Sequence, residues 1–450
     1  MQMNYPNVEQ SQRYYEQASD LIPGRTQLIS RRADQFAAGV SPIYARQASG
    51  ARFIDVDENE YLDWVNAVGA IILGHADPVV NDAVKEQIDR GSIFTLNSPL
   101  ELELAHELND TIPSSEMVRY TKGGGEACAV AARIARGTTG RDKMLICGYH
   151  GWLDWYQAAN HGADPESGEY PFAGIEPTGV PQALADTVRP FSYGDLPMLQ
   201  RLLDENRGQV AGIMMEPMRS ELPPDGYLAA VRQLAHDHDV ILIFDEVSCG
   251  WRMSIGGVQE YLGIKPDMTV VAKCMSNGYP MGAVVGQRSI MEPAARMFIS
   301  SSYWSDNIGL VAALTTIREL KRRDAQTHFQ TIGTQLKSAL NQSFGEAALN
   351  GHCAGVYANP YLHFDLTEPY QNPMDARKVN TLFVQEMARR GIHCLTSFKA
   401  TLAHTEDDIA QTAAAATEVF GIIKQGLEQN KLDELIIADL RKDPFRRLVK

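Results

Sequence analysis

The stretch VILIFDEVSCGWRMSIGGVQEYLGIKPDMTVVAK, residues 240–273, contains two apolar runs that end close to charged residues. The first run, VILIFDEV, carries Asp245, and the second, MTVVAK, ends at Lys273. Nearly continuous apolar runs of this length predict strands that are buried on both faces, as in a parallel sheet. Because the carboxyl ends of parallel strands share one edge of the sheet, we expect Asp245 and Lys273 to lie at the same edge.

The middle of the chain repeats this pattern of strands alternating with helices. The further predicted strands are MVRYT (117–121), KMLICG (143–148), AGIMMEP (211–217) and GAVVG (282–286), and the predicted helices cover 126–136, 196–206 and 228–238. The alternation is typical of an α/β fold with a mostly parallel sheet that is covered on both faces.

The two ends of the chain follow other patterns. GARFIDVDENEYLDWV (50–65) predicts an antiparallel hairpin, and the part after residue 320 predicts helices over 329–344, 376–391 and 405–428 and a strand over 361–366. In the last helix, Thr405 followed by Asp408 forms a start signal. We therefore expect a segment 1–70 that joins a small domain, a large α/β domain 71–319 and a smaller α+β domain 320–450. The basic end, RKDPFRRLVK (441–450), indicates a solvated tail.

Composition narrows the range of partners. The 450 residues have a formal net charge of −15, which argues against nucleic acid or an anionic membrane as the main partner. No apolar stretch approaches the roughly 18–20 residues of a membrane span, and the first residues lack the features of a signal peptide. The six cysteines have no CxxC or metal-ligand spacing, as expected of free thiols in a reducing compartment. The sequence predicts a cytoplasmic protein without a metal site.

A glycine-rich stretch, YTKGGGEACAVAARIARG (120–137), predicts a strand, a turn and the start of a helix. The amides of Gly124, Gly125 and Glu126 offer a place for a phosphate, because a helix N-terminus has unpaired N–H groups and a partial positive charge. A glycine-rich turn is just as often only a turn, and the stretch is neither GxGxxG nor a P-loop.

Two other groups of side chains follow predicted strands. CGYHGWLDWY (147–156) brings Tyr149 and His150 after a strand, where they offer a flat face to a planar ligand. The alternative is that these rings belong to the core, and that Asp245 is a helix cap or a surface acid. One ligand explains all these features together, namely pyridoxal phosphate, which needs an anion site, a stacking partner, a carboxylate for its ring nitrogen and a lysine.

With these features, the chain resembles the class III, or ω-type, aminotransferases of fold type I, and among them the glutamate-1-semialdehyde aminomutase branch. The motifs that carry the resemblance run through nearly the whole chain: SPIYARQASGARFIDVDENEYLDWVNAVGAIILGHADPVV (41–80), GGGEA, YHGW, MEP, FDEV, AKCMSNGYPMGAVVG and HTEDDI. The resemblance implies a pyridoxal-phosphate-dependent transferase that is an obligate homodimer with active sites at the subunit interface.

The resemblance also implies roles for individual residues. Lys273 is the lysine that forms the Schiff base with the cofactor, and Asp245 is the partner of the pyridine nitrogen. Tyr149 and Val247 lie on opposite faces of the ring. The remaining positions carried over are the phosphate loop, the supporting acids and a hydroxyl from the partner subunit: Gly124, Gly125, Glu126, Glu216 and Ser302.

Two departures from the family pattern bear on binding. The loop that usually reads Asn-Ser-Gly-Thr-Glu-Ala is Lys122-Gly-Gly-Gly-Glu-Ala here, so the phosphate site keeps backbone amides and the Lys122 charge but loses its hydroxyls. Asp34 stands where the aminomutase branch has an arginine that clamps a substrate carboxylate, with Arg31 and Arg32 nearby. An aspartate repels a carboxylate, so the aminomutase activity is not expected, and amino sugars or other hydroxylated substrates become attractive.

The sequence thus predicts a pyridoxal-phosphate-dependent aminotransferase that moves an amino group from an amine or amino-acid donor to an aldehyde or ketone acceptor. An aminomutase or amino-acid racemase with the same cofactor is the nearest alternative. A nucleotide-dependent α/β oxidoreductase would use the glycine turn as its pyrophosphate loop, but it leaves Lys273 and Asp245 unexplained. A cofactor-free binding relative would not need to keep both residues.

Overall fold

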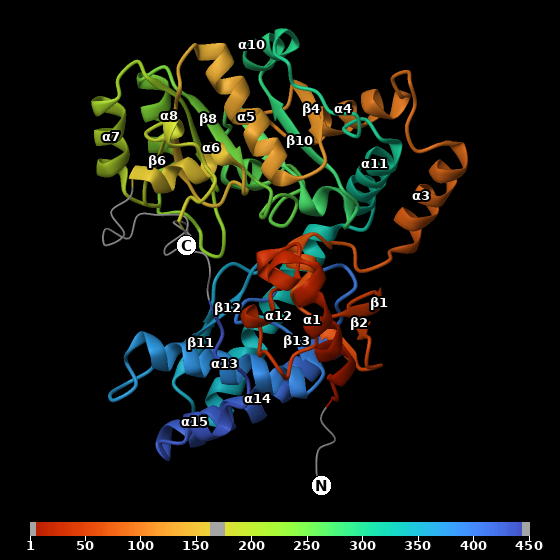
Figure 1. Ribbon diagram of the computed structural model, residues 1–450, viewed down its shortest axis with the longest axis vertical. Coiled ribbons are helices and arrows are strands. Elements are labelled where there is room, and N and C mark those ends of the chain that lie inside the picture. Colours follow the sequence, from red (N-terminus) through yellow and green to blue (C-terminus); the bar gives the residue numbers. More distant parts are fainter. Residues whose placement is uncertain (1–5, 163–175, 443–450) are drawn as a thin grey trace. The chain divides into compact units, whose positions relative to one another are not determined.

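The computed structural model describes residues 6–162 and 176–442 (Figure 1). The chain divides into two units: unit 1 contains the N-terminal part up to Asp77 together with Thr327–Asp443, and unit 2 contains Pro78–Gln326. The two ends of the chain therefore fold together in unit 1. The boundaries between the units fall after Asp77 and Gln326, whereas the sequence led us to expect domain boundaries after residues 70 and 319. Residues 443–450 of the predicted basic tail lie outside the described residues, as do the first five residues of the chain.

Unit 2 is built on a seven-stranded sheet with the strand order β4-β10-β9-β8-β7-β5-β6. The strands are β4 (Met117–Thr121), β5 (Lys143–Cys147), β6 (Val188–Pro190), β7 (Val210–Met215), β8 (Ile241–Asp245), β9 (Met268–Val271) and β10 (Gly282–Gly286). β10 runs antiparallel to β4 and β9, and the other pairs are parallel. The predicted mostly parallel sheet is confirmed.

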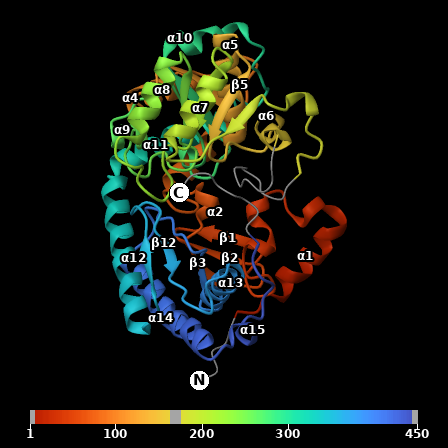
Figure 2. The same ribbon diagram turned by 90° about the vertical axis from the view of Figure 1, so that its left-hand side faces the viewer.

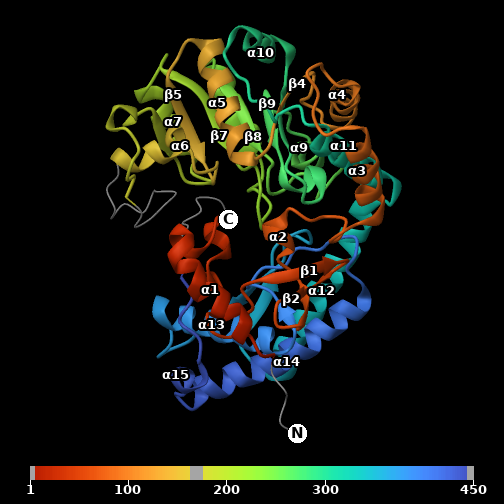
Figure 3. The same cartoon turned by 45° about the vertical axis from the view of Figure 1, so that its right-hand side comes forward.

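Helices cover both faces of this sheet. On β5, Met144 and Ile146 pack in one core cluster with α5 (Gly124–Thr139), whereas Leu145 and Cys147 pack in a second cluster with α7 (Leu196–Glu205) and α8 (Tyr227–Asp237). Figure 3 shows α5 lying across one face of the strands. Since neighbouring side chains on a strand point to opposite faces, a run that is apolar at every position is what a doubly covered sheet requires.

The remaining helices of unit 2 connect or flank the strands. They are α3 (Pro78–Arg90), α4 (Pro99–Thr111), α6 (Asp154–Gln157), α9 (Val258–Leu262), α10 (Arg288–Met291) and α11 (Asn307–Arg322), and a short 3₁₀ turn, η6, covers Lys273–Ser276.

Unit 1 is an α+β structure with two small sheets (Figure 2). The strands β1 (Ala45–Ser49), β2 (Arg52–Asp55), β3 (Glu60–Asp63) and β13 (Ile392–His393) form one sheet, and β11 (Gly351–Ala354) pairs with β12 (Tyr361–Phe364). β2 and β3 are the predicted hairpin. The helices are α1 (Glu9–Leu21), α2 (Asn66–Gly69), α12 (Ala325–Ala347), α13 (Pro373–Arg389), α14 (Glu406–Glu428) and α15 (Leu432–Leu435). In the described part of the chain, no helix is both long and apolar enough to cross a bilayer.

The start of α14 is fixed by reciprocal capping. Thr405 Oγ1 accepts a hydrogen bond from the Asp408 N–H at 3.3 Å, and Asp408 Oδ2 accepts one from the Thr405 N–H at 2.9 Å. Two N–H groups that the helix itself cannot bond are satisfied in this way. The start signal predicted from the sequence is confirmed.

Replacing Thr405 by alanine should lower the stability of unit 1 by about 1 kcal/mol, because the cap is lost. Urea unfolding followed by circular dichroism measures the change. Thr417→Ala is the matched control: Thr417 lies inside the same helix, where its hydroxyl donates to the Ala413 carbonyl at 3.1 Å and, on the surface, to Glu346 at 3.4 Å, and alanine is a better helix former. Equal losses in the two variants would contradict the capping role.

Candidate active site

Asp245 and Lys273 leave the sheet at the same edge. β8 and β9 are parallel neighbours in which Asp245 lies opposite Val270, and the Glu246 N–H donates to the Val270 carbonyl at 2.9 Å. Lys273 begins the η6 turn directly after β9. The expectation that consecutive strands deliver the acid and the lysine to one edge is therefore met.

The next strands along the sheet add their own side chains at this edge. β7 lies beside β8 and is followed by Glu216, and β5 lies beside β7 and is followed by Tyr149 and His150. The Tyr149 N–H donates to Glu216 Oε2 at 3.1 Å, so the buried Glu216 carboxylate holds the start of the loop that carries Tyr149.

Asp245 is buried and accepts three hydrogen bonds. Its Oδ2 receives His150 Nδ1 at 2.7 Å and the Cys128 thiol at 3.4 Å, and its Oδ1 receives the Val247 N–H at 3.0 Å. Since a carboxylate only accepts, His150 carries its proton on Nδ1. His150 Nε2 is buried and has no hydrogen-bond partner among the described residues. Three donors fix the orientation of the carboxylate.

The Cys128 thiol lies where these charges converge. Burial raises the pKa of Cys128 well above its ordinary value, and the nearby Asp245 and Glu216 carboxylates raise this pKa further, while the Lys273 ammonium opposes them. Cys128 therefore stays protonated and acts as a donor.

Lys273 is half-buried, and its Nζ donates to Ser248 Oγ at 2.8 Å. Its backbone has a φ of 44°, in the left-handed region that side-chain-bearing residues rarely adopt. Such a conformation persists only where the surroundings hold it in place, and it concentrates at functional sites.

The start of α5 has backbone N–H groups that no side chain caps. Gly124 and Gly125 are the first residues of the helix, and Gly123 at the N-cap offers no side chain to bond their amides. A Cβ on Gly124 would lie 2.7 Å from Val247 Cγ1, and one on Gly151 would lie 2.6 Å from the Gly125 Cα. The start of the helix therefore lies so close to the loops after β5 and β8 that only glycine fits at these positions. Without side chains in the way, the helix N–H groups stay available to an anion.

The side chains beside this helix start are occupied. Lys122 Nζ forms an ion pair with Asp306, the residue that caps α11 by accepting from the N–H groups of Ile308 and Gly309. The Lys122 charge is therefore already balanced by Asp306. Glu126 is exposed, and its Oε2 accepts from the Lys122 N–H at 2.9 Å.

Ser302 lies in the exposed turn that precedes α11. Sequence reasoning missed Ser248 and Cys128, which contact the predicted lysine and the predicted acid. Ser248 had a usable signal, because it follows Asp245 in the same loop. Cys128 had no such signal, since a cysteine among alanines on a helix is typical of a core residue.

These residues fit pyridoxal phosphate. The site has a primary amine, a buried carboxylate whose direction is fixed, a helix start without side-chain caps, and glycines whose replacement by any larger residue would fill the space between helix and loops. An aldehyde, a protonated ring nitrogen and a phosphate are the groups that such an arrangement binds.

Comparison with known proteins identifies the family. Residues 35–350 match the aminotransferase class-III family, so the chain belongs to it. Its relatives include a 3-aminobutyryl-CoA aminotransferase of Cloacimonas acidaminovorans, 32% identical over 93% of this chain and 99% of the relative. They also include a glutamate-1-semialdehyde 2,1-aminomutase of Methanosarcina acetivorans, 31% identical over 91% of this chain and 98% of the relative.

The fold agrees with this assignment. The solved structure of a transaminase with PLP bound has a TM-score of 0.82 to this chain at 25% identity, covering 93% of this chain and 98% of that one. The protein is a pyridoxal-phosphate-dependent aminotransferase of fold type I.

A second buried acid, Glu246, lies next to Asp245 in the chain. Its carboxylate accepts from the N–H groups of Val258 and Gln259 and from Gln259 Nε2, at 2.7, 3.1 and 3.2 Å. Burial raises the pKa of Glu246 to about 7 against the pull of these donors. The folded protein therefore keeps a proton on Glu246 at a pH where the unfolded chain has lost it.

The sign of the resulting pH dependence follows from linkage. Between pH 4.5 and about 7 the folded state binds more protons than the unfolded state, so the Glu246 contribution to stability decreases as the pH rises, by about 3 kcal/mol at most. Glu246→Gln should flatten this part of the dependence. Urea unfolding of the cofactor-free protein at pH 5 and pH 8 measures it, with the exposed Glu205→Gln as control. An unchanged pH dependence in Glu246→Gln would rule the effect out.

Proposed function

We propose that Lys273 and Asp245 are the catalytic residues of this aminotransferase, acting on an amine or amino-acid donor and an aldehyde or ketone acceptor. The observation that carries the proposal is their convergence at one sheet edge, the lysine amine held by Ser248 and the carboxylate held by three donors. An isolated buried carboxylate is costly, and a cationic ring nitrogen is the partner that would compensate it.

Bound pyridoxal phosphate supplies an aldehyde carbon that takes the amino group and a ring that accepts the electrons of the broken C–H bond. Asp245 would hold the ring nitrogen protonated, and His150 and Cys128 are positioning residues that aim its carboxylate. Lys273 Nζ takes the proton from the substrate carbon and returns it, as base and then acid. Ser248 Oγ orients this amine.

The other residues hold the cofactor in place. The amides of Gly124, Gly125 and Glu126 at the start of α5 would bind the phosphate. Tyr149 and Val247 would flank the ring, and both pack against the core cluster between α5 and the sheet. Glu216 supports the Tyr149 backbone.

Replacing Lys273 by alanine should abolish the visible absorption band of the lysine-bound cofactor and lower the rate of amino transfer by several orders of magnitude. Spectra of the purified protein with added pyridoxal phosphate measure the first effect, and product formation measures the second. Lys265→Ala, an exposed lysine of the same unit, is the control and should behave as wild type. A Lys273→Ala protein with the wild-type spectrum would end the proposal.

A screen of single half-reactions identifies the donor. Adding amines, amino acids and amino sugars one at a time to the loaded enzyme should change the cofactor spectrum only for true donors. The 31% identical aminomutase makes isomerisation the second candidate. A transaminase releases a keto product and stops without an acceptor, whereas an isomerase returns the cofactor to its first form.

We further propose that the protein is a cytoplasmic homodimer in which Ser302 of one subunit completes the phosphate site of the other. Large apolar side chains exposed on unit 2 support the proposal that a second copy of the chain packs against this unit. Leu96 is 83% exposed, Phe298 86% and Tyr303 69%. Six buried cysteines without a disulfide support a reducing compartment.

Hybrid dimers test the shared site. Ser302→Ala alone should weaken cofactor binding about five- to tenfold, the effect of one lost hydrogen bond. In dimers of one Lys273→Ala subunit and one Ser302→Ala subunit, a hydroxyl acting across the interface leaves one site fully intact. One cofactor per dimer should then bind with wild-type affinity. If Ser302 acts within its own subunit, no site of the hybrid has that affinity.

A further inference from the structure

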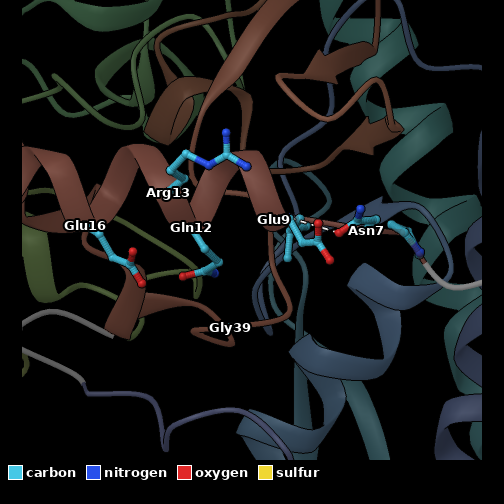
Figure 4. Close-up of a pocket in the computed structure, with 8 residues that line it drawn as sticks. Asn7, Glu9, Gln12, Arg13, Glu16 and Gly39 are labelled. Carbon is cyan, nitrogen blue, oxygen red and sulfur yellow. Dashed lines mark hydrogen bonds between the residues drawn. The ribbon is translucent and has the colours of Figure 1, made fainter.

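Unit 1 has an open hollow along α1 that does not select a ligand class. Figure 4 shows Gln12 and Glu16 extending from one side of the helix and Arg13 from the other. Both signs of charge line the hollow, and none of its described lining residues is aromatic. A site needs converging groups of one chemistry, and the hollow does not have them.

In unit 2, Lys122 and Asp306 form an ion pair between segments that lie far apart in the sequence. Only 16% of the Lys122 side chain and 21% of the Asp306 side chain are exposed, so water and salt screen this pair less than a surface pair. Lys122 precedes the start of α5, and Asp306 precedes the start of α11. Because Lys122 stands where the family usually has an asparagine, the pair is a departure of this chain from the family pattern.

Lys122 joins the start of α5 to the start of α11. Its N–H donates to Glu126 Oε2 at 2.9 Å, so its backbone is tied to the first turn of α5. Its Nζ lies 3.6 Å from Met281 Sδ, and a Cβ on Gly309 would lie 2.7 Å from the same Nζ. The ammonium therefore lies against the first turn of α11.

Asp306 holds both α11 and the turn before it. Its Oδ1 accepts from two N–H groups in the first turn of α11, at 2.9 and 3.3 Å, while its Oδ2 pairs with Lys122. Its own N–H donates to the Tyr303 carbonyl at 3.2 Å, which closes the turn that contains Ser302. The position of this turn therefore depends on Asp306.

Both ends of the segment around this turn are tied to β4. At its start, Arg119 on β4 donates to the Ile299 carbonyl, and at its end Lys122, which follows β4 directly, pairs with Asp306. Between these two ends, Ser302 is exposed. Loss of the Lys122 charge would release one of the ties and leave a carboxylate that is mostly buried without its cation.

The same turn belongs to the surface on which we propose that a second copy of the chain packs. Phe298 is 86% exposed and Tyr303 69%. The Asn307 N–H, the first of α11, donates to the Ser92 carbonyl at 2.7 Å, in the segment that carries the exposed Leu96. The ion pair thus fixes a part of unit 2 that faces the partner in the proposed dimer.

We propose that Lys122 is a positioning residue for the cofactor site of the partner subunit. Through Asp306, it holds the turn so that Ser302 reaches the phosphate bound by the other subunit. This role rests on the proposed function, because it requires the shared phosphate site. The opposite role would be a direct contact between the Lys122 ammonium and the phosphate in its own subunit.

Two single variants break the pair and spare the cap of α11. Lys122→Met keeps the length of the side chain and removes its charge, and Asp306→Asn keeps a good N-cap residue and removes the charge of the acid. Each should weaken pyridoxal phosphate binding about three- to tenfold, and the double variant should bind no more weakly than the singles, since all three lose one contact. Titration of the cofactor-free protein, followed at the visible band of the lysine-bound cofactor, measures the affinity.

Lys143→Met is the matched control. The Lys143 side chain is 17% exposed and pairs with Asp186, between β5 and the turn before β6. This variant should bind the cofactor within about twofold of wild type. If Lys122 instead contacted the phosphate itself, Asp306→Asn would free its charge and tighten binding. Tighter binding in Asp306→Asn, or wild-type affinity in both variants of the pair, would overturn the proposal.

Hybrid dimers show on which site Lys122 acts. When one subunit carries Lys273→Ala, only the other subunit, the reporting subunit, forms the visible band. Lys122→Met added to the Lys273→Ala subunit should weaken cofactor binding at the reporting site, because the turn of that subunit serves this site. Lys122→Met placed in the reporting subunit should leave the affinity of its site unchanged. The reverse pattern would also overturn the proposal.

The same two hybrids with Ser302→Ala in place of Lys122→Met separate this role from the proposed function. If Ser302 acts on the reporting site from the other subunit and Lys122 acts within its own, the shared site stands and the role of Lys122 is wrong. If Ser302 acts within its own subunit, the shared site itself is wrong, and the role of Lys122 falls with it.

Discussion

The parallel pairing of β8 and β9 is the constraint on which the active site depends. It sets Asp245 opposite Val270 and so fixes where the chain must turn to begin η6 at Lys273. Because strand pairing is rigid, the acid and the amine need no binding energy to find each other. A shift of one residue in this register would turn Asp245 to the opposite face of the sheet and separate the pair.

The sheet of unit 2 could be predicted because burial on both faces leaves a plain signal. β7, β8 and β9 are apolar at nearly every position, and β4 and β10 were predicted with the bounds that the structure has. β6 was missed because three residues ending in Pro190 carry too little pattern. β13 was missed for the same reason: its two residues form a strand only because they pair with β3, which lies far away in sequence.

The residues of the candidate site likewise divide into those that a local sequence pattern predicts and those that it does not. Lys273, Asp245 and Tyr149 stand at strand ends, where topology alone places a side chain. Cys128 contacts Asp245 from a helix, and the Lys122–Asp306 ion pair joins residues far apart in sequence. Such contacts depend on how elements pack, and no local pattern encodes them.

The loop after β8 is held in place by a buried acid, Glu246. Glu246 ties this loop to β9 through its N–H and to the start of α9 through its carboxylate. Val247 is held from the other side, since its N–H donates to Asp245. Ser248 follows these two pinned residues, so the direction in which it offers Oγ to Lys273 is set by hydrogen bonds on both sides. The amine is thus positioned by the loop of its neighbouring strand. Of the two acids in the DEV motif, Asp245 ends the strand at the sheet edge, and Glu246 holds the loop whose Ser248 contacts the lysine.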